Sequence, residues 1–203
     1  MNESAPLRLS LFFSLLVALL LGACRAAEPA EPPLKGATMG GAFTLTDQNG
    51  RRVSDSDFAG KYRLVYFGFT FCPDVCPTDL QAIGAGLRRF ERSDPARAAK
   101  VQPIFITVDP ARDTPPVMGR YVANFHPRLI GLTGSEAEIN YVASRYRIGH
   151  QRLDPAPGRP PDEYAVDHTR ITVLYGPQSE PIVIVPSDQG AGAVAAELDR
   201  WVR

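Results

Sequence analysis

Residues 67–80, FGFTFCPDVCPTDL, contain two cysteines, Cys72 and Cys76, and each of them is followed directly by a proline. The residues leading into the pair, 62–69, are mainly aromatic and β-branched, which is typical of a buried central strand. After the pair, residues 77–90 place apolar side chains on one helical face and begin with a proline, which the first position of a helix tolerates. The stretch therefore predicts a strand, a cysteine loop and a helix in succession.

The remainder of the chain predicts an alternation of strands and helices, which indicates a mixed α/β sheet with helices on both faces. The first two strands are joined by Asn-Gly turn chemistry, so we predict an N-terminal β-hairpin. A strand, a cysteine loop, a helix and a later hairpin together indicate a thioredoxin-like layout. A proline-rich segment, residues 152–161, is predicted to be irregular. The predicted strands are 42–46, 51–53, 101–108, 129–132, 171–175 and 181–185, and the further helices are 115–125, 136–146 and 192–202.

The length and charge of the chain limit the classes of protein to which it can belong. The 203 residues suit one domain with a leader, and 22 basic residues balance 22 acidic ones. A chain without excess positive charge lacks the composition of a nucleic-acid-binding domain, so we expect no nucleic-acid partner.

The N-terminus has the composition of a targeting segment. Residues 9–23 are apolar apart from two serines, and the run is shorter than a comfortable membrane span, as in a signal peptide. It ends in LGAC, which resembles a bacterial lipobox. We therefore predict a lipoprotein-type signal peptide over residues 1–23, with Cys24 lipidated; the alternative is an uncleaved N-terminal anchor.

Either form of attachment predicts an exported, membrane-anchored domain on the periplasmic or extracytoplasmic face. Residues 24–39 are rich in proline, alanine and glutamate, which predicts a flexible tether. The folded domain is expected over residues 40–203.

The prolines decide how the cysteine pair is expected to fold. A residue before proline is biased away from helical geometry, so Cys72 and Cys76 are predicted to lie in a loop, with the helix beginning at Pro77. The helix N-terminus would then favour a thiolate on Cys76. The prolines and Asp74 also argue against full burial of the pair.

The uses open to these thiols are a structural disulfide, two buried apolar side chains, redox chemistry or metal binding. A disulfide suits an exported domain, but one that closes so short a loop stabilises little. Redox or metal chemistry is therefore the favoured hypothesis.

A metal would need further ligands, and the chain has three histidines. His126 follows a predicted helix and His150 lies at a predicted strand end, so both are interpreted as structural or solvent-facing. His168 follows an aspartate just before a strand and is the favoured ligand. Two sulfurs with one imidazole suit copper, whereas structural zinc prefers four protein ligands. Asp74 and Asp109 are further carboxylate candidates, although turn capping explains Asp109 equally well.

Three separated motifs, GFTFCPDVCP (68–77), VDPARDTP (108–115) and YAVDHT (164–169), together resemble the SCO/SenC family. These are thioredoxin-fold proteins that assist assembly of the dinuclear copper centre of cytochrome c oxidase. The resemblance extends from about Gly40 to the C-terminus. The family commonly has a transmembrane anchor where this chain has a lipobox-like sequence.

The resemblance implies that Cys72, Cys76 and His168 bind one copper per chain, as Cu(I) or Cu(II), with Asp109 and Asp167 in a supporting role. It implies, as partners, the copper-bearing subunit of the oxidase and a second copper chaperone or a thioredoxin-like reductase. The expected function is that of a copper metallochaperone.

Two other functions use the same thiols. A thiol–disulfide oxidoreductase would cycle Cys72 and Cys76 to keep oxidase cysteines reduced, but the CxxxC spacing departs from the CxxC of thioredoxin. A thiol peroxidase would share the fold, but no proline stands at the required position upstream of Cys72.

Overall fold

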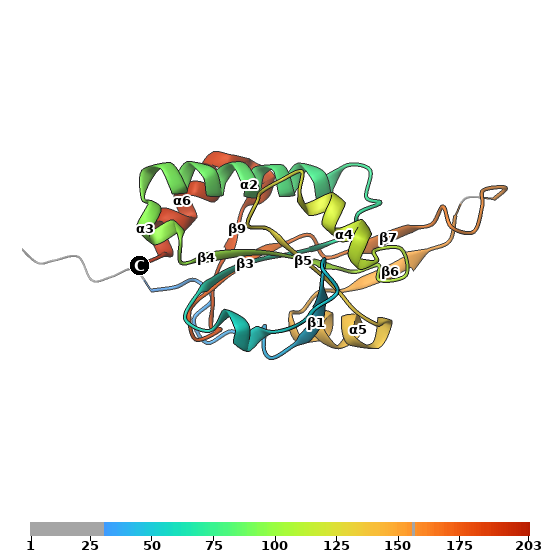
Figure 1. The fold of residues 1–203 in the computed structure, drawn as a ribbon, viewed down its shortest axis with the longest axis horizontal. Helices are drawn as coiled ribbons and strands as arrows, with labels where there is room; N and C mark the ends of the chain where they lie inside the picture. The colour runs from blue at the N-terminus through green and yellow to red at the C-terminus, as the bar shows by residue number, and fades with distance from the viewer. Residues whose placement is uncertain (1–30, 156) are drawn as a thin grey trace, which may run out of the picture. The chain divides into compact units, whose positions relative to one another are not determined.

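A seven-stranded mixed sheet forms the centre of the domain, with the strand order β2-β1-β5-β4-β3-β8-β9 (Figure 1). The computed structural model describes residues 31–155 and 157–203; the predicted signal peptide and Cys24 lie outside the described residues. The strands of this sheet are β1 (Thr44–Asp47), β2 (Arg52–Ser54), β3 (Tyr62–Gly68), β4 (Val101–Thr107), β5 (Ile130–Thr133), β8 (Thr172–Tyr175) and β9 (Pro181–Val185).

Strand β3 occupies the middle of the hydrophobic core. All seven of its residues are buried, which matches the near-continuous apolar sequence expected of a strand covered on both faces. It pairs in parallel with β4 and antiparallel with β8. The sheet is therefore mixed, and β1 and β2 form the predicted N-terminal hairpin.

Helices cover both faces of the sheet, as the alternation of elements predicted. Helices α2 and α6 pack together on one face, and α5 lies on the other (Figure 1). No helix among the described residues has the length and apolar composition that crossing a membrane requires. The helices are η1 (Asp55–Phe58), α2 (Val75–Ser93), α3 (Pro95–Ala98), α4 (Pro115–Val122), α5 (Glu136–Arg145), η2 (Ser187–Gln189) and α6 (Ala191–Trp201).

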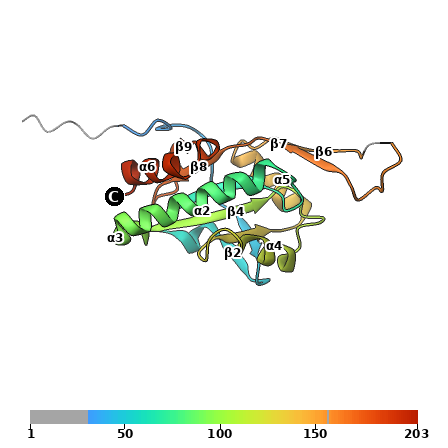
Figure 2. The ribbon, with the colours of Figure 1, turned by 90° about the horizontal axis from the view of Figure 1, so that it is seen from above.

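A second, two-stranded sheet was not predicted. Strands β6 (His150–Leu153) and β7 (Ala165–His168) form an antiparallel ribbon, which extends away from the main sheet in Figure 2. The prediction of an irregular segment over residues 152–161 was therefore wrong at its start. Among the described residues, neither helix nor strand lies between Leu153 and Ala165.

The described part of the expected tether contacts the domain. The Leu34 N–H donates a hydrogen bond of 3.0 Å to the carbonyl of Ile182, and Leu34 and Met39 pack against the hydrophobic core. The packed chain therefore begins before Gly40, the expected domain start.

Candidate functional site

The cysteine pair lies between β3 and α2. Cys72 is half-buried in the connecting loop, and Cys76 occupies the first turn of α2, which begins at Val75. The helix therefore starts two residues before the predicted Pro77. Proline is acceptable there because the first backbone N–H groups of a helix have no carbonyl partner within it.

Cys76 is fully buried, contrary to the expectation from its flanking residues. Its Sγ packs so closely on Gly68 that a Cβ added to this glycine would lie 2.9 Å from the sulfur. Burial raises the pKa of the Cys76 thiol to about 12. The predicted thiolate at the helix N-terminus is therefore not favoured for Cys76, because desolvation by burial disfavours the charged form of the thiol.

Cys72 provides the more accessible sulfur. Both thiols are free, and the backbone N–H of Cys76 donates to Cys72 Sγ over 3.4 Å. This hydrogen bond brings the Cys72 sulfur to the start of α2.

His168, the last residue of β7 in the ribbon, is the third candidate ligand. Its Nε2 lies 3.5 Å from Cys76 Sγ, although 92 residues separate the two in sequence. Its Nδ1 lies 3.1 Å from the carbonyl oxygen of Thr169. A proton on Nδ1, donated to that oxygen, leaves the lone pair of Nε2 facing the sulfur. Burial lowers the pKa of His168, which favours this neutral form.

The spacing of Cys76 and His168 suits two ligands of one ion. At a tetrahedral ion with metal–sulfur and metal–nitrogen bonds of about 2.3 and 2.0 Å, the two donor atoms lie roughly 3.5 Å apart. In the described parts of the chain, no three His, Cys, Asp or Glu side chains already surround a common point as metal ligands.

The two predicted supporting carboxylates lie elsewhere. Asp109 accepts hydrogen bonds from Tyr164 Oη, at 2.6 Å, and from Arg112 Nε, at 2.5 Å. Asp167 is exposed and precedes His168 on β7. Neighbouring residues of a strand point to opposite faces, so the Asp167 side chain points away from the cysteines. The structure thus brings together Cys72, Cys76 and His168 but neither aspartate.

Asp113, which the sequence did not predict, anchors the cysteine loop. It is fully buried and accepts hydrogen bonds from Thr70 N at 3.0 Å and from Thr70 Oγ1 at 2.6 Å. The hydroxyl of Thr107, at the end of β4, donates a third over 2.6 Å. Asp113 therefore ties the loop before Cys72 to the neighbouring strand.

Asp79, also not predicted, links α2 to the segment after His168. Its carboxylate is fully buried and pairs with Arg170, whose Nε and Nη2 lie at 2.7 and 2.8 Å. Asp79 lies three residues after Cys76, and Arg170 lies two after His168. The ion pair therefore links the first turns of α2 to the segment that follows His168. The sequence feature that could have revealed this role is the acidic residue directly beside Leu80, on the buried face of α2.

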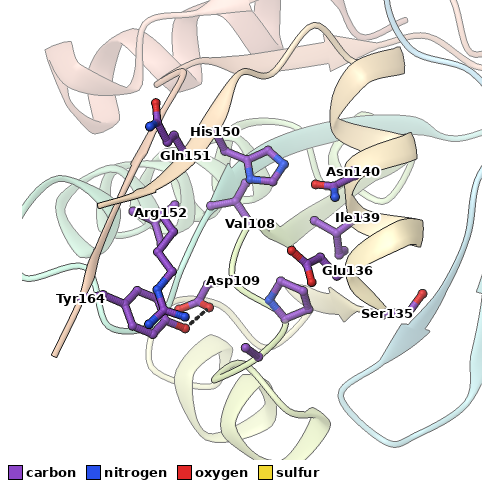
Figure 3. Close-up of a pocket in the computed structure, with 14 residues that line it drawn as sticks. Val108, Asp109, Ser135, Glu136, Ile139, Asn140, His150, Gln151, Arg152 and Tyr164 are labelled. Carbon is purple, nitrogen blue, oxygen red and sulfur yellow. Dashed lines mark hydrogen bonds between the residues drawn. The ribbon is translucent and has the colours of Figure 1, made fainter. Parts of the chain in front are cut away.

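A cleft of about 490 Å³ lies between α5 and the ribbon. Figure 3 shows Ile139 and Asn140 of α5 on one side and His150 and Arg152 of β6 on the other. Tyr164 and its partner Asp109 lie at one end. The partly exposed His150 thus lines this cleft.

The chain matches known proteins over most of its length. The SCO1/SenC family model matches residues 31–203. The chain belongs to the SCO1/SenC family. The human protein "Protein SCO1 homolog, mitochondrial" is 37% identical over 166 residues, which cover 81% of this chain and 53% of that protein. The chain thus spans about half the length of the curated SCO1/SenC relatives that it matches.

Solved structures place the fold of this SCO1/SenC chain as well. The structure of Bradyrhizobium japonicum ScoI with copper bound aligns with a TM-score of 0.70 and 40% identity, over 80% of this chain and 99% of that one. The thioredoxin domain of a Bacteroides vulgatus thiol-disulfide oxidoreductase is 14% identical, with a TM-score of 0.55 over 81% of this chain and 96% of that one. The second likeness concerns the fold alone, and it confirms the predicted thioredoxin-like layout.

Proposed function

We propose that this chain is a copper metallochaperone that assists assembly of the copper centre of cytochrome c oxidase, with copper as its cargo. The observation that carries the proposal is the 3.5 Å approach of His168 Nε2 to Cys76 Sγ, beside the second thiol of Cys72. Two sulfurs and an imidazole form a soft donor set that suits copper. The likeness to a copper-bound ScoI, at 40% identity, supports the same cargo.

The different exposure of the three candidate donors suits the capture and release of copper. His168 is held neutral by burial and needs no proton loss before it binds a metal. Cys76 keeps its proton until a metal replaces it, because burial raises its pKa to about 12. Cys72 is the donor that an incoming ligand reaches first, since it is the more exposed of the two cysteines. The copper-bearing subunit of the oxidase is the proposed recipient.

A copper titration tests the proposal. The reduced full chain is expected to bind one Cu(I), and Cys72→Ser or His168→Ala to weaken the affinity on the order of 100-fold, because each removes a ligand of this donor set. Competition with a chromophoric Cu(I) chelator measures the affinity. Cys24→Ser serves as the control for a thiol outside the site. Wild-type affinity in Cys72→Ser would contradict the proposal.

The same two thiols support a second candidate, a thiol–disulfide oxidoreductase that keeps oxidase cysteines reduced. Cys72 is accessible and receives the Cys76 N–H, as an attacking thiol requires, while Cys76 lies behind it as the resolving thiol. The two functions differ in their need for His168. Full oxidase assembly by His168→Ala in cells that lack the wild-type gene would favour the redox function over copper delivery.

We also propose that the domain is exported and held at a membrane through Cys24. The support is the apolar run over residues 9–23 and the LGAC sequence that ends it. Mass spectrometry of the mature protein is expected to find a chain that begins at Cys24 and carries an added lipid mass. An intact N-terminus would contradict this form of attachment, and Cys24→Ser should release the protein from the membrane fraction.

A further inference from the structure

His150 and His168 are direct cross-strand partners in the β6–β7 ribbon. The neighbouring pair, Gly149 and Thr169, is hydrogen-bonded, since the Thr169 N–H donates to the Gly149 carbonyl over 2.8 Å. Hydrogen-bonded and non-hydrogen-bonded pairs alternate along an antiparallel ladder. His150 and His168 therefore form a non-hydrogen-bonded pair, in which the two Cα atoms lie about 4.5 Å apart and the side chains approach most closely.

Both imidazoles project from the face of the ribbon that turns toward the domain. The next pair on this face is Arg152 with Val166, and Val166 is buried. His150 lines the cleft of Figure 3, and it also lines a second hollow together with His168. In the structure its ring lies near Val108 in the cleft (Figure 3). The His150 side chain thus borders both hollows.

The other histidine has no such freedom. His126 is buried, with its Nε2 at 3.3 Å from Glu91 and its Nδ1 accepting the Arg128 N–H over 3.2 Å. His150 makes no side-chain hydrogen bond among residues 31–155 and 157–203, and it is partly exposed. An imidazole that lacks a structural partner and lies opposite a candidate metal ligand is suited to ligation.

The two oxidation states of copper prefer different ligands, and a second imidazole matters for only one of them. Thiolates favour Cu(I), whereas Cu(II) prefers tetragonal geometry with nitrogen or oxygen donors. We infer that His150 supplies a second imidazole to Cu(II) bound by Cys72, Cys76 and His168, whereas Cu(I) is held by those three alone. The inference rests on the proposed copper function and adds a fourth ligand that the oxidised ion requires.

Pulsed electron paramagnetic resonance of the full chain, loaded with Cu(II) under anaerobic conditions, counts the coordinated imidazoles. The wild type is expected to show two and His150→Gln one. The Cu(II) affinity of His150→Gln should fall on the order of 10-fold or more, because the loss of a residue that only supports a metal ligand already weakens metal binding by about this much. Its Cu(I) affinity should stay at the wild-type value. Gln151→Ala, which alters the opposite face of β6, is the matched control and should retain two imidazoles.

A second variant tests the histidine pair without the thiols. Cys72→Ser/Cys76→Ser is expected to hold Cu(II) weakly through two imidazoles, and adding His150→Gln should remove one of them. One imidazole in the wild type, with Cu(I) still bound by the cysteines, would overturn the inference and leave the proposed function standing. A wild type that binds neither Cu(I) nor Cu(II) would overturn both.

Discussion

Asp79→Ala is expected to weaken Cu(I) binding about 10-fold, although Asp79 is not a ligand; losses of this size accompany removal of groups that orient metal ligands. Asp79 holds Arg170 through two hydrogen bonds of 2.7 and 2.8 Å. Without it, the segment that follows His168 loses its attachment to α2, and the imidazole is no longer fixed against Cys76. The unfolding free energy should fall by about 2 kcal/mol, less than for a fully buried pair because Arg170 is partly exposed.

Asp94→Ala is the matched control, because it removes a carboxylate that pairs with Arg97 at the other end of α2. It should lower stability and leave Cu(I) affinity unchanged. Chelator competition and urea unfolding of both variants separate the two effects. If both variants lost affinity equally, or if Asp79→Ala kept the wild-type affinity, Asp79 would have no positioning role.

Asp113→Ala is expected to lower the unfolding free energy by about 3 kcal/mol, because two half-buried donors and one fully buried donor lose a buried acceptor. These donors are the backbone N–H and hydroxyl of Thr70 and the hydroxyl of Thr107. The loop that precedes Cys72 should also detach from β4, so thiol-alkylating reagents should react faster with Cys72. Wild-type stability in urea unfolding would contradict the anchoring role of Asp113.

The isosteric variant Asp113→Asn adds a dependence on pH. Burial raises the pKa of Asp113 above its usual value, so the folded chain holds this proton more tightly than the unfolded chain does. The resulting stability is complete below the unfolded pKa of about 3.9 and is lost as the pH rises through the folded pKa. The advantage of the wild type over Asp113→Asn should therefore be largest near the unfolded pKa of about 3.9 and shrink as the pH rises through the raised folded pKa. A difference that is constant with pH would contradict this.

The sequence predicted the fold where apolar periodicity was strong. The apolar run of β3 and the one-sided pattern of α2 both form as expected, with changes only at their ends. The ribbon was missed because His150–Leu153 is short and mostly exposed, so no alternation of apolar residues marks it. The prolines that follow also favoured an irregular segment.

The three candidate donors could be picked out from the sequence, whereas the residues that hold them in place could not. Cys72, Cys76 and His168 stood out by residue type and motif, and the structure places them together. The burial of Cys76 depends on Gly68 lying against its sulfur, a tertiary contact that periodicity does not reveal. Asp79 finds its partner 91 residues away, and a buried carboxylate gives no local sign of so distant an ion pair.

The ribbon that carries His168 shares no hydrogen-bonded ladder with the seven-stranded sheet in the described parts of the chain. A two-stranded ribbon is only marginally stable by itself, and segments with little buried surface open at a small fraction of the global unfolding free energy. The ribbon can therefore fray while β3, α2 and both thiols stay in place. The lifetime of the imidazole contact is then set by this local opening, so a protein that docks on the ribbon could lengthen or shorten it without unfolding the domain.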